Sequence, residues 1–157
     1  MTPIEKYKFE AVTNENRKII YISGTIDEDT NFNPLLDFGK TLILNLSKIA
    51  SINSCGIRNW VNFFKDLNNT QVIYEECTPL LVRQMNMIPS FLGKAHVASV
   101  FVPYLCATCE EEKIILVKED KFNGGNIKIE ETLVCEKCQK GEMEFDGKPK
   151  QYFAFTK

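Results

Sequence analysis

The sequence has no long hydrophobic run, no large excess of either charge and very little histidine. The uninterrupted apolar stretches, of which Ile114–Val117 is typical, are far shorter than the roughly 20 residues that a membrane-spanning helix needs. Charged residues also interrupt positions 1–10, where a secretory signal would need a continuous apolar core. A formal net charge of −2 gives the chain no general attraction for nucleic acid or anionic lipid. We therefore expect a cytoplasmic protein, without membrane insertion, whose partners are proteins or small molecules.

The sequence also lacks the usual patterns of an enzyme. His96 is the single histidine, so a Ser-His-Asp or Cys-His arrangement has one candidate base, and no neighbouring pattern marks it as one. Gly124-Gly125 lies between expected strands, without the helix that a phosphate-binding loop requires. These observations favour a non-catalytic function.

Six cysteines are present, and four of them form two Cys-x-x-Cys pairs, Cys106 with Cys109 and Cys135 with Cys138. Two intervening residues let a turn direct both sulfurs to one point, and two such knuckles supply the four-sulfur tetrahedron that zinc prefers. Without export the thiols are expected to stay reduced and free to bind metal. Four thiolates leave no open position for catalysis, so we predict a structural zinc. An iron site, a dithiol redox pair and cysteines without a common function are the alternatives.

Short strands are expected around the cysteine pairs. A segment of about 50 residues rarely buries enough apolar surface to fold alone, and a structural zinc can supply about 10 kcal/mol or more. We predict one hairpin that brings the knuckles together and a second one near the C-terminus. The strands of the first are expected at 113–118 and 127–134, and the second is expected to turn at 146–147 and end at 152–155.

Up to Val102 the apolar residues recur in the alternating pattern of strands and helices, whereas the remainder has short strand-like runs and turn residues. This change predicts a boundary near Pro103-Tyr104, with an α/β domain at 1–104 and a small β zinc-ribbon-like module at 105–157. The α/β domain is expected to be a mixed, largely parallel sheet with helices packed on it. Its strands are predicted at 7–12, 18–23, 41–46, 72–74 and 97–102, and its helices at about 34–38, 54–67 and 79–88.

Two of these elements have clear local signals. Thr41–Leu46 is almost continuously apolar, which is typical of a strand covered on both faces, so it is predicted to lie at the sheet centre. Asn53 or Ser54 can accept a hydrogen bond from the first turn of the next helix. That helix carries an apolar stripe at helical spacing, which predicts packing on the sheet. The stripe consists of Ile57, Trp60, Val61, Phe64 and Leu67.

Three stretches of this first segment resemble the STAS domain, the α/β module of bacterial anti-sigma factor antagonists and of transporter accessory subunits. Ile19–Asp27 is similar to the family's strand ending in Gly-x-x-Asp, and Leu42–Ser47 to its next strand. Ile52–Ile57 resembles the family's Asp-Ser-Ser-Gly-Leu at the loop before helix two. The resemblance covers about Tyr7 to Val102 and implies a STAS-like fold.

The resemblance also implies a function. It predicts a non-enzymatic adaptor whose loop and helix at 53–67 dock on a protein, such as a kinase, an anti-sigma-like factor or a transporter component. In the antagonist branch the partner kinase phosphorylates the residue before the glycine. That residue is Cys55 here, and Asn53 replaces the family's aspartate. The resemblance assigns the partner-binding or switch loop to Asn53, Ser54, Cys55, Gly56 and Arg58.

Other functions fit single features of the sequence. A helix N-terminus favours the thiolate form of a cysteine, so Cys55 is a candidate redox sensor, although free cysteine more often behaves as a small hydrophobe. Zinc ribbons can bind nucleic acid, but four thiolates on Zn²⁺ add negative charge beside Glu110–Glu112, which disfavours phosphate. We expect the ribbon to provide a second protein contact. Its aromatic residues are expected to serve either that contact or the ribbon's own core, and they are Tyr152, Phe153 and Phe155.

Overall fold

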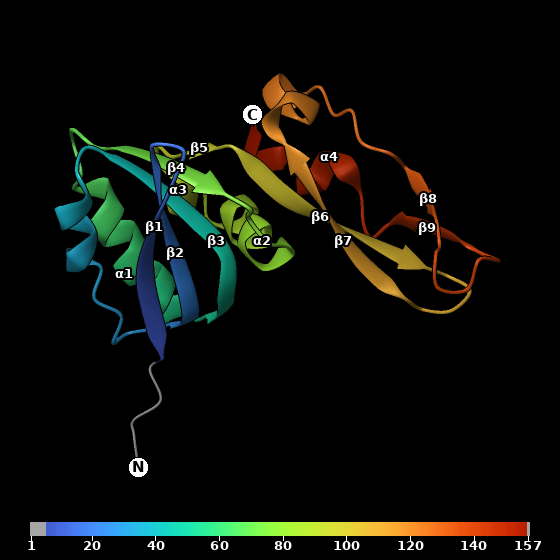
Figure 1. The fold of residues 1–157 in the computed structure, drawn as a ribbon, viewed down its shortest axis with the longest axis horizontal. Coiled ribbons are helices and arrows are strands. Elements are labelled where there is room, and N and C mark those ends of the chain that lie inside the picture. Colours follow the sequence, from blue (N-terminus) through green and yellow to red (C-terminus); the bar gives the residue numbers. More distant parts are fainter. Residues whose placement is uncertain (1–5, 157) are drawn as a thin grey trace, which may run out of the picture.

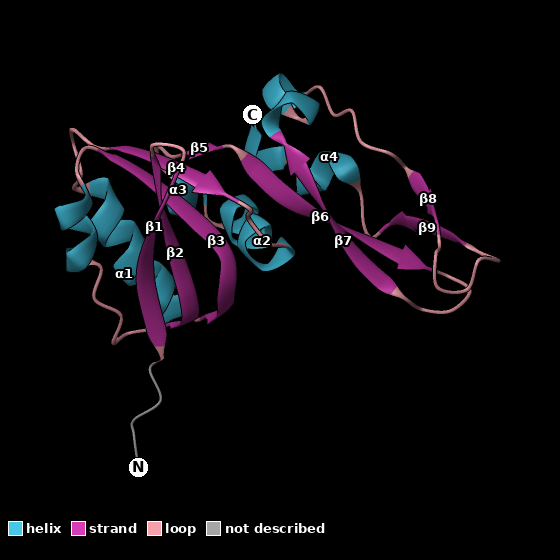
Figure 2. Ribbon diagram, in the orientation of Figure 1, coloured by secondary structure: helices cyan, strands magenta, loops and turns pink. Residues whose placement is uncertain are grey.

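The computed structural model describes residues 6–156 and contains two β-sheets joined end to end (Figure 1). The first sheet has the strand order β1-β2-β3-β4-β5, and the second has the order β7-β6-β9-β8. Helices α1, α2 and α3 lie on one side of the first sheet (Figure 2). The protein is thus a mixed α/β structure with an additional small β-sheet, as the sequence predicts.

The first sheet begins with an antiparallel hairpin of β1 (Tyr7–Asn14) and β2 (Arg17–Ile26). The remaining strands each pair in parallel with the strand before them. These strands are β3 (Thr41–Ile52), β4 (Gln71–Glu75) and β5 (His96–Val97). The third strand is the middle one of five, which confirms its predicted central place. Parallel neighbours need crossover connections, and the helices supply them.

Helices α1 and α2 agree with the predictions, whereas α3 was not predicted and the first predicted helix is of the 3₁₀ type. Helix α1 spans Ser54–Lys65, and α2 (Pro79–Met87) is followed at once by the short α3 (Pro89–Leu92). The segment predicted as a helix near 34–38 is a 3₁₀ helix, η1 (Asn33–Phe38). Pro34 stands at its start and Gly39 follows its end, so only a short element fits between them.

Trp60 is the centre of the first core. Its side chain is fully buried and lies against the rings of Phe32, Phe64 and Phe91. Its indole Nε1 donates a hydrogen bond of 2.9 Å to the hydroxyl of Tyr74. The apolar stripe of α1 therefore packs against the sheet, as its spacing predicts.

The second sheet begins with a strand that crosses the predicted boundary at residue 104. Strand β6 (Ser99–Cys106) pairs with β7 (Glu112–Lys118) and with β9 (Glu142–Phe145), which also pairs with β8 (Thr132–Val134). The single strand predicted at 97–102 is therefore wrong, because Val97 ends β5 and Ser99 begins a strand of the other sheet. The division of the chain into 1–104 and 105–157 stays a prediction.

Both predicted hairpins of the second half are wrong. Strand β7 pairs with β6 and not with the segment 127–134, of which only the last residues form β8. The segment 152–155 is not a strand, because Pro149 starts the short helix α4 (Pro149–Tyr152) and a 3₁₀ turn follows it. The local sequence pattern favoured strands in both segments, but most of 127–134 and all of 152–155 pair with no strand of the sheet.

The C-terminal aromatic residues pack against the first part of the chain. Phe153 is buried and stacks on Phe122, with ring centroids 5.3 Å apart. The Asn86 side-chain amide on α2 donates to the backbone oxygen of Tyr152 at 2.9 Å. These aromatics thus lie in a core that both sheets share, and they do not form a free contact surface.

Within residues 6–156, the helices are all too short or too polar to cross a membrane.

Gly56 allows α1 to begin directly against the end of β2. A Cβ atom at this position would lie 2.3 Å from the backbone oxygen of Ile26 and 2.9 Å from the backbone nitrogen of Asp27. We expect Gly56→Ala to lower the free energy of unfolding by about 1–3 kcal/mol in urea denaturation, because backbone atoms must move. Asn62→Ala, at an exposed position of the same helix, is the matched control and should change it by less than about 0.5 kcal/mol. Equal effects of the two substitutions would contradict this account.

Candidate metal centre

The two Cys-x-x-Cys pairs form similar turns at neighbouring places in the second sheet. The first pair begins at the end of β6, and the second begins directly after β8. In the first turn the Cys106 backbone oxygen accepts from the N–H of Glu110 at 2.8 Å, and in the second the Cys135 oxygen accepts from Gln139 at 2.9 Å. Glu110 and Gln139 both have positive φ angles, near 61° and 56°. The same backbone turn thus presents each pair of sulfurs.

All four sulfurs face one point. The Sγ atoms of Cys106 and Cys138 are 3.8 Å apart, those of Cys109 and Cys135 are 3.6 Å apart, and all four lie within 4.8 Å of one another. A tetrahedral ion with metal–sulfur distances of about 2.3 Å requires sulfur–sulfur distances of about 3.8 Å. A disulfide would require about 2.05 Å. The predicted cluster is therefore assembled as a candidate metal site, and its thiols are not paired as disulfides.

The backbone favours thiolates at two of these positions. Hydrogen bonds from the backbone N–H groups of Lys140 and Gly141 lower the pKa of Cys138 to about 6. The backbone N–H of Cys109 is the main cause that lowers the pKa of Cys106. The pKa of Cys109 is raised to about 12, although the N–H of Glu111 acts to lower it, because burial and the adjacent sulfurs outweigh that donor. A divalent cation would remove this mutual repulsion and hold all four sulfurs as thiolates.

Gly141 provides the space that the cluster needs. A Cβ atom there would lie 2.4 Å from the hydroxyl oxygen of Thr108 and 3.1 Å from the sulfur of Cys106. The backbone oxygen of Gly141 also accepts from the N–H of Cys135 at 3.2 Å. Sequence analysis missed this glycine, because the atoms that exclude a side chain there belong to the opposite knuckle.

Lys137 lies in the second knuckle, and its ammonium donates to the carboxylate of Glu111 at 2.8 Å. This bond is the main cause that raises the pKa of Lys137, and the nearby charges of Cys109 and Cys135 raise it further. A cation beside the cluster offsets part of the negative charge that four thiolates bring. An ion pair thus connects the two knuckles, in addition to the close approach of their sulfur atoms.

The other two cysteines lie outside the cluster. Cys55 is exposed near the start of α1, and Cys77 is buried in the core shared by the two sheets. Burial raises the pKa of Cys77, so this thiol stays protonated. His96, the single histidine, lies 2.8 Å from the carboxylate of Glu119 through its Nε2 atom.

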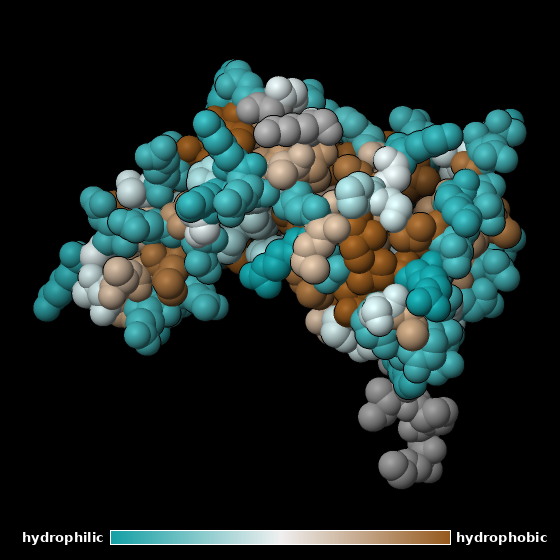
Figure 3. Space-filling model, turned by 180° about the vertical axis from the view of Figure 1, so that it is seen from behind, coloured by the Kyte–Doolittle hydropathy of each residue, from teal (hydrophilic) through white to brown (hydrophobic). Residues whose placement is uncertain are grey.

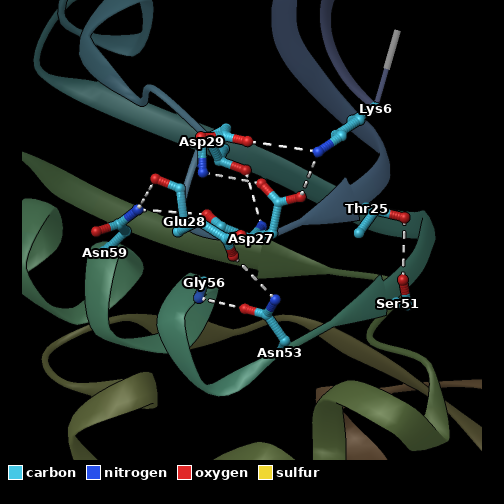
Figure 4. Close-up of polar contacts among 10 residues, drawn as sticks. Lys6, Thr25, Asp27, Glu28, Asp29, Ser51, Asn53, Gly56 and Asn59 are labelled. Atoms are coloured by element: carbon cyan, nitrogen blue, oxygen red, sulfur yellow. Dashed lines mark hydrogen bonds and ion pairs between the residues drawn. The ribbon is translucent and has the colours of Figure 1, made fainter. Parts of the chain in front are cut away.

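The residues of the predicted switch loop form the cap and the first turns of α1, where Figure 4 shows Asn53 and Gly56. The Asn53 side chain accepts a hydrogen bond from the backbone N–H of Gly56 at 2.7 Å, which confirms the predicted helix cap. Ser54, Cys55 and Arg58 are exposed beside this cap. The loop is therefore ordered, and it presents three side chains to solvent.

A second loop, which follows β2, holds the switch loop in place, and sequence analysis assigned no function to most of it. The Asn53 amide donates to the carboxylate of Glu28 at 3.2 Å, and the Asn59 amide donates to the backbone oxygen of Glu28 at 3.1 Å. The buried carboxylate of Asp27 accepts from the N–H of Asp29 at 2.9 Å and lies 3.6 Å from the ammonium of Lys6 (Figure 4). Asp27, the aspartate of the Gly-x-x-Asp stretch, is the residue of the sequence that could have indicated the role of this loop.

No protein-family model and no curated protein matches this sequence.

The cysteine cluster predicts a definite metal content. We expect one metal ion per chain by elemental analysis, with zinc favoured by four thiolate ligands. Cys106→Ser and Cys138→Ser should each lower the metal content severalfold and lower the thermal stability of the second sheet. Cys55→Ser is the matched control and should leave both unchanged, because this thiol is exposed and outside the cluster. Full metal content in either cluster variant, or folded second-sheet signals in strong chelator, would refute the assignment.

Gly141→Ala tests the close approach of the two knuckles. The added methyl group must displace Thr108 or the sulfur of Cys106, so we expect at least a tenfold loss of metal affinity in a competition titration with a chromogenic chelator. Gly147→Ala, just after β9, is a control for the loss of a glycine away from the cluster. Its positive φ of 122° strains an alanine, but the Cβ would meet only one ring atom of Phe145, at 3.7 Å. An affinity for Gly141→Ala equal to that of the control would show that the knuckles do not need this contact.

Proposed function

We propose that this protein is a non-catalytic regulatory adaptor with two protein-contact surfaces. In this proposal a STAS-like unit docks one partner through the loop and helix at 53–67, and a zinc ribbon provides the second contact. Zinc is the proposed metal, because a closed set of four thiolates suits a structural ion without an open position. The proposed partner of the first surface is a kinase or anti-sigma-like factor, or a cytoplasmic part of a transporter.

The contact between two of the three STAS-like stretches carries the first part of this proposal. The end of Ile19–Asp27 lies directly against the start of α1, where Gly56 leaves no room for a side chain. The backbone N–H of Asn53 donates to the oxygen of Ile26 at 3.2 Å. Leu42–Ser47 lies in β3, the strand that leads into this loop. The first and third stretches therefore meet at the start of α1, and the second lies earlier in the strand that leads there.

This position suits docking because it is rigid and exposed. The side-chain amides of Asn53 and Asn59 donate to Glu28 in the loop after β2 and hold the start of α1, so a partner would meet a preformed surface with little ordering cost. The solvent-exposed side of α1 carries positive charge from Arg58 and Lys65, and α1 contains no acidic residue. Apolar side chains gather between the helices on the same side of the molecule (Figure 3).

Cys55 changes how such a surface would be regulated. It stands immediately before Gly56, where the antagonist branch of the resembling family carries its phosphorylated residue. A thiol cannot take a phosphate from a serine kinase at this position. We therefore propose constitutive docking here, without a phosphorylation switch at residue 55.

The outer face of the second sheet is the proposed second contact. Cross-strand partners point to the same face, and the pairs Pro103 with Ile114 and Leu105 with Glu112 are both solvent-facing. Leu105, Ile114 and Leu116 are among the most exposed large apolar residues. Carboxylates of Glu112 and Glu144 flank this stripe, so a partner with apolar and basic side chains fits it.

The adaptor proposal is tested by affinity capture with three forms of the full-length, metal-loaded protein. We expect the wild type to recover specific proteins from nuclease-treated lysate of its native cells. Arg58→Glu should lower recovery of one partner at least tenfold, because it reverses the charge at the exposed face of α1. Ile114→Glu should affect only a partner of the second sheet.

The control is Lys8→Gln, an exposed change on β1, which should recover the same proteins as the wild type. Identical recovery with all forms would exclude both surfaces as docking sites. Recovery that disappears only after nuclease treatment would favour a nucleic-acid-associated regulator instead.

A further inference from the structure

A cavity of about 290 Å³ lies away from both the metal centre and the switch loop. Its walls are the C-terminal half of α1, the strand β4 and the segment that leads from α3 to β5. No residue of 53–58 and none of the cluster cysteines is among its described lining residues. The cavity is thus a separate feature of the α/β unit.

The floor of the cavity is rigid and apolar. It is formed by Val72, Tyr74 and Phe91, which are each less than one tenth exposed. The Tyr74 hydroxyl accepts from Trp60 at 2.9 Å and donates to the backbone oxygen of Phe91 at 3.0 Å. Because these polar atoms already have partners, the floor offers a ligand only apolar contact. The apolar wall continues with Val61, Phe64, Leu67, Leu92 and Ala95.

The rim of the cavity has charge of one sign. Lys65 lines it from the end of α1, and Lys94 lines it from the turn before β5. The described lining residues include no aspartate and no glutamate. Neither lysine forms an ion pair with another residue in the range 6–156. Both ammonium groups are therefore available to an anion at the mouth of an apolar space.

We propose that this cavity binds a small amphipathic carboxylate, with its hydrocarbon part on the aromatic floor and its carboxylate between Lys65 and Lys94. The cavity equals about ten water volumes, which matches a ligand of about ten non-hydrogen atoms such as an eight-carbon fatty acid. A preformed apolar pocket with a few polar groups at its mouth is the usual form of a small-molecule site. The proposal does not rest on the docking function, although Lys65 belongs both to the docking segment 53–67 and to the rim of the cavity.

Trp60 lies behind the floor of the cavity, in contact with Phe91, and so serves as a reporter of binding. It is the single tryptophan of the chain and is fully buried, and its ring stacks on Phe91 with centroids 4.9 Å apart. Titration of the full-length protein with octanoate should change its emission saturably, with a Kd of about 0.1–1 mM. Amide chemical shifts at 61–67 and 91–95 should move over the same concentration range.

Charge and volume variants test the assigned position. We expect Lys65→Gln combined with Lys94→Gln to weaken octanoate about fivefold or more and to leave binding of octan-1-ol unchanged. Lys8→Gln, an exposed lysine change on β1, is the matched control and should leave octanoate binding unchanged. Ala95→Leu should fill part of the cavity and weaken both ligands.

Several results would overturn the proposal. The first is the absence of a saturable signal at 10 mM octanoate, which is about ten times the weakest expected Kd. The second is equal binding of octanoate and octylammonium. The third is unchanged octanoate binding in the double lysine variant. Urea unfolding of each variant shows whether it is folded. If Ala95→Leu does not fold, the double lysine variant and the comparison of octanoate with octan-1-ol and octylammonium still test the proposal.

Discussion

The four cysteine sulfurs have to reach one point, and this requirement determines how the second sheet is built. One pair follows β6 and the other follows β8, so these strands must end close together although many residues separate them. Strand β9 lies between them in the sheet and pairs with both. A metal ion bound by this cluster would contribute folding free energy directly to the second sheet. The backbone turns and Gly141 shape the candidate site.

A shared core joins this sheet to the α/β unit. Strand β6 continues from the first unit into the second, and its Val100 forms a parallel bridge with Cys77. The C-terminal segment returns to α2, where the Asn86 amide donates to backbone oxygens of Gln151 and Tyr152. The buried residues of both sheets consequently form one continuous cluster. Loss of the metal is therefore expected to loosen the second sheet more than the first, because α1 and β3 keep their own contacts.

The three candidate functional regions use different physical devices. The metal centre depends on thiolate chemistry and on backbone N–H groups that favour charged sulfur. The switch loop depends on side-chain amides that fix the start of α1. The cavity depends on an aromatic floor without free polar atoms and on two lysines at its rim. The metal centre shares no residue with the other two regions, whereas the proposed docking segment 53–67 also contributes Val61, Phe64, Lys65 and Leu67 to the cavity.

The sequence alone determined the elements with strong local signals. Most strands and helices of the first unit follow from apolar periodicity, and Asn53 marks the start of α1, because capping depends on residues next to each other. The cysteine spacing likewise identified all four members of the cluster. Only the tertiary structure decided that β6 belongs to the second sheet, that Tyr152 and Phe153 pack near α2, and that Gly141 must lack a side chain. Each of these depends on atoms distant in sequence, and a local pattern carries no information about which distant surface will cover it.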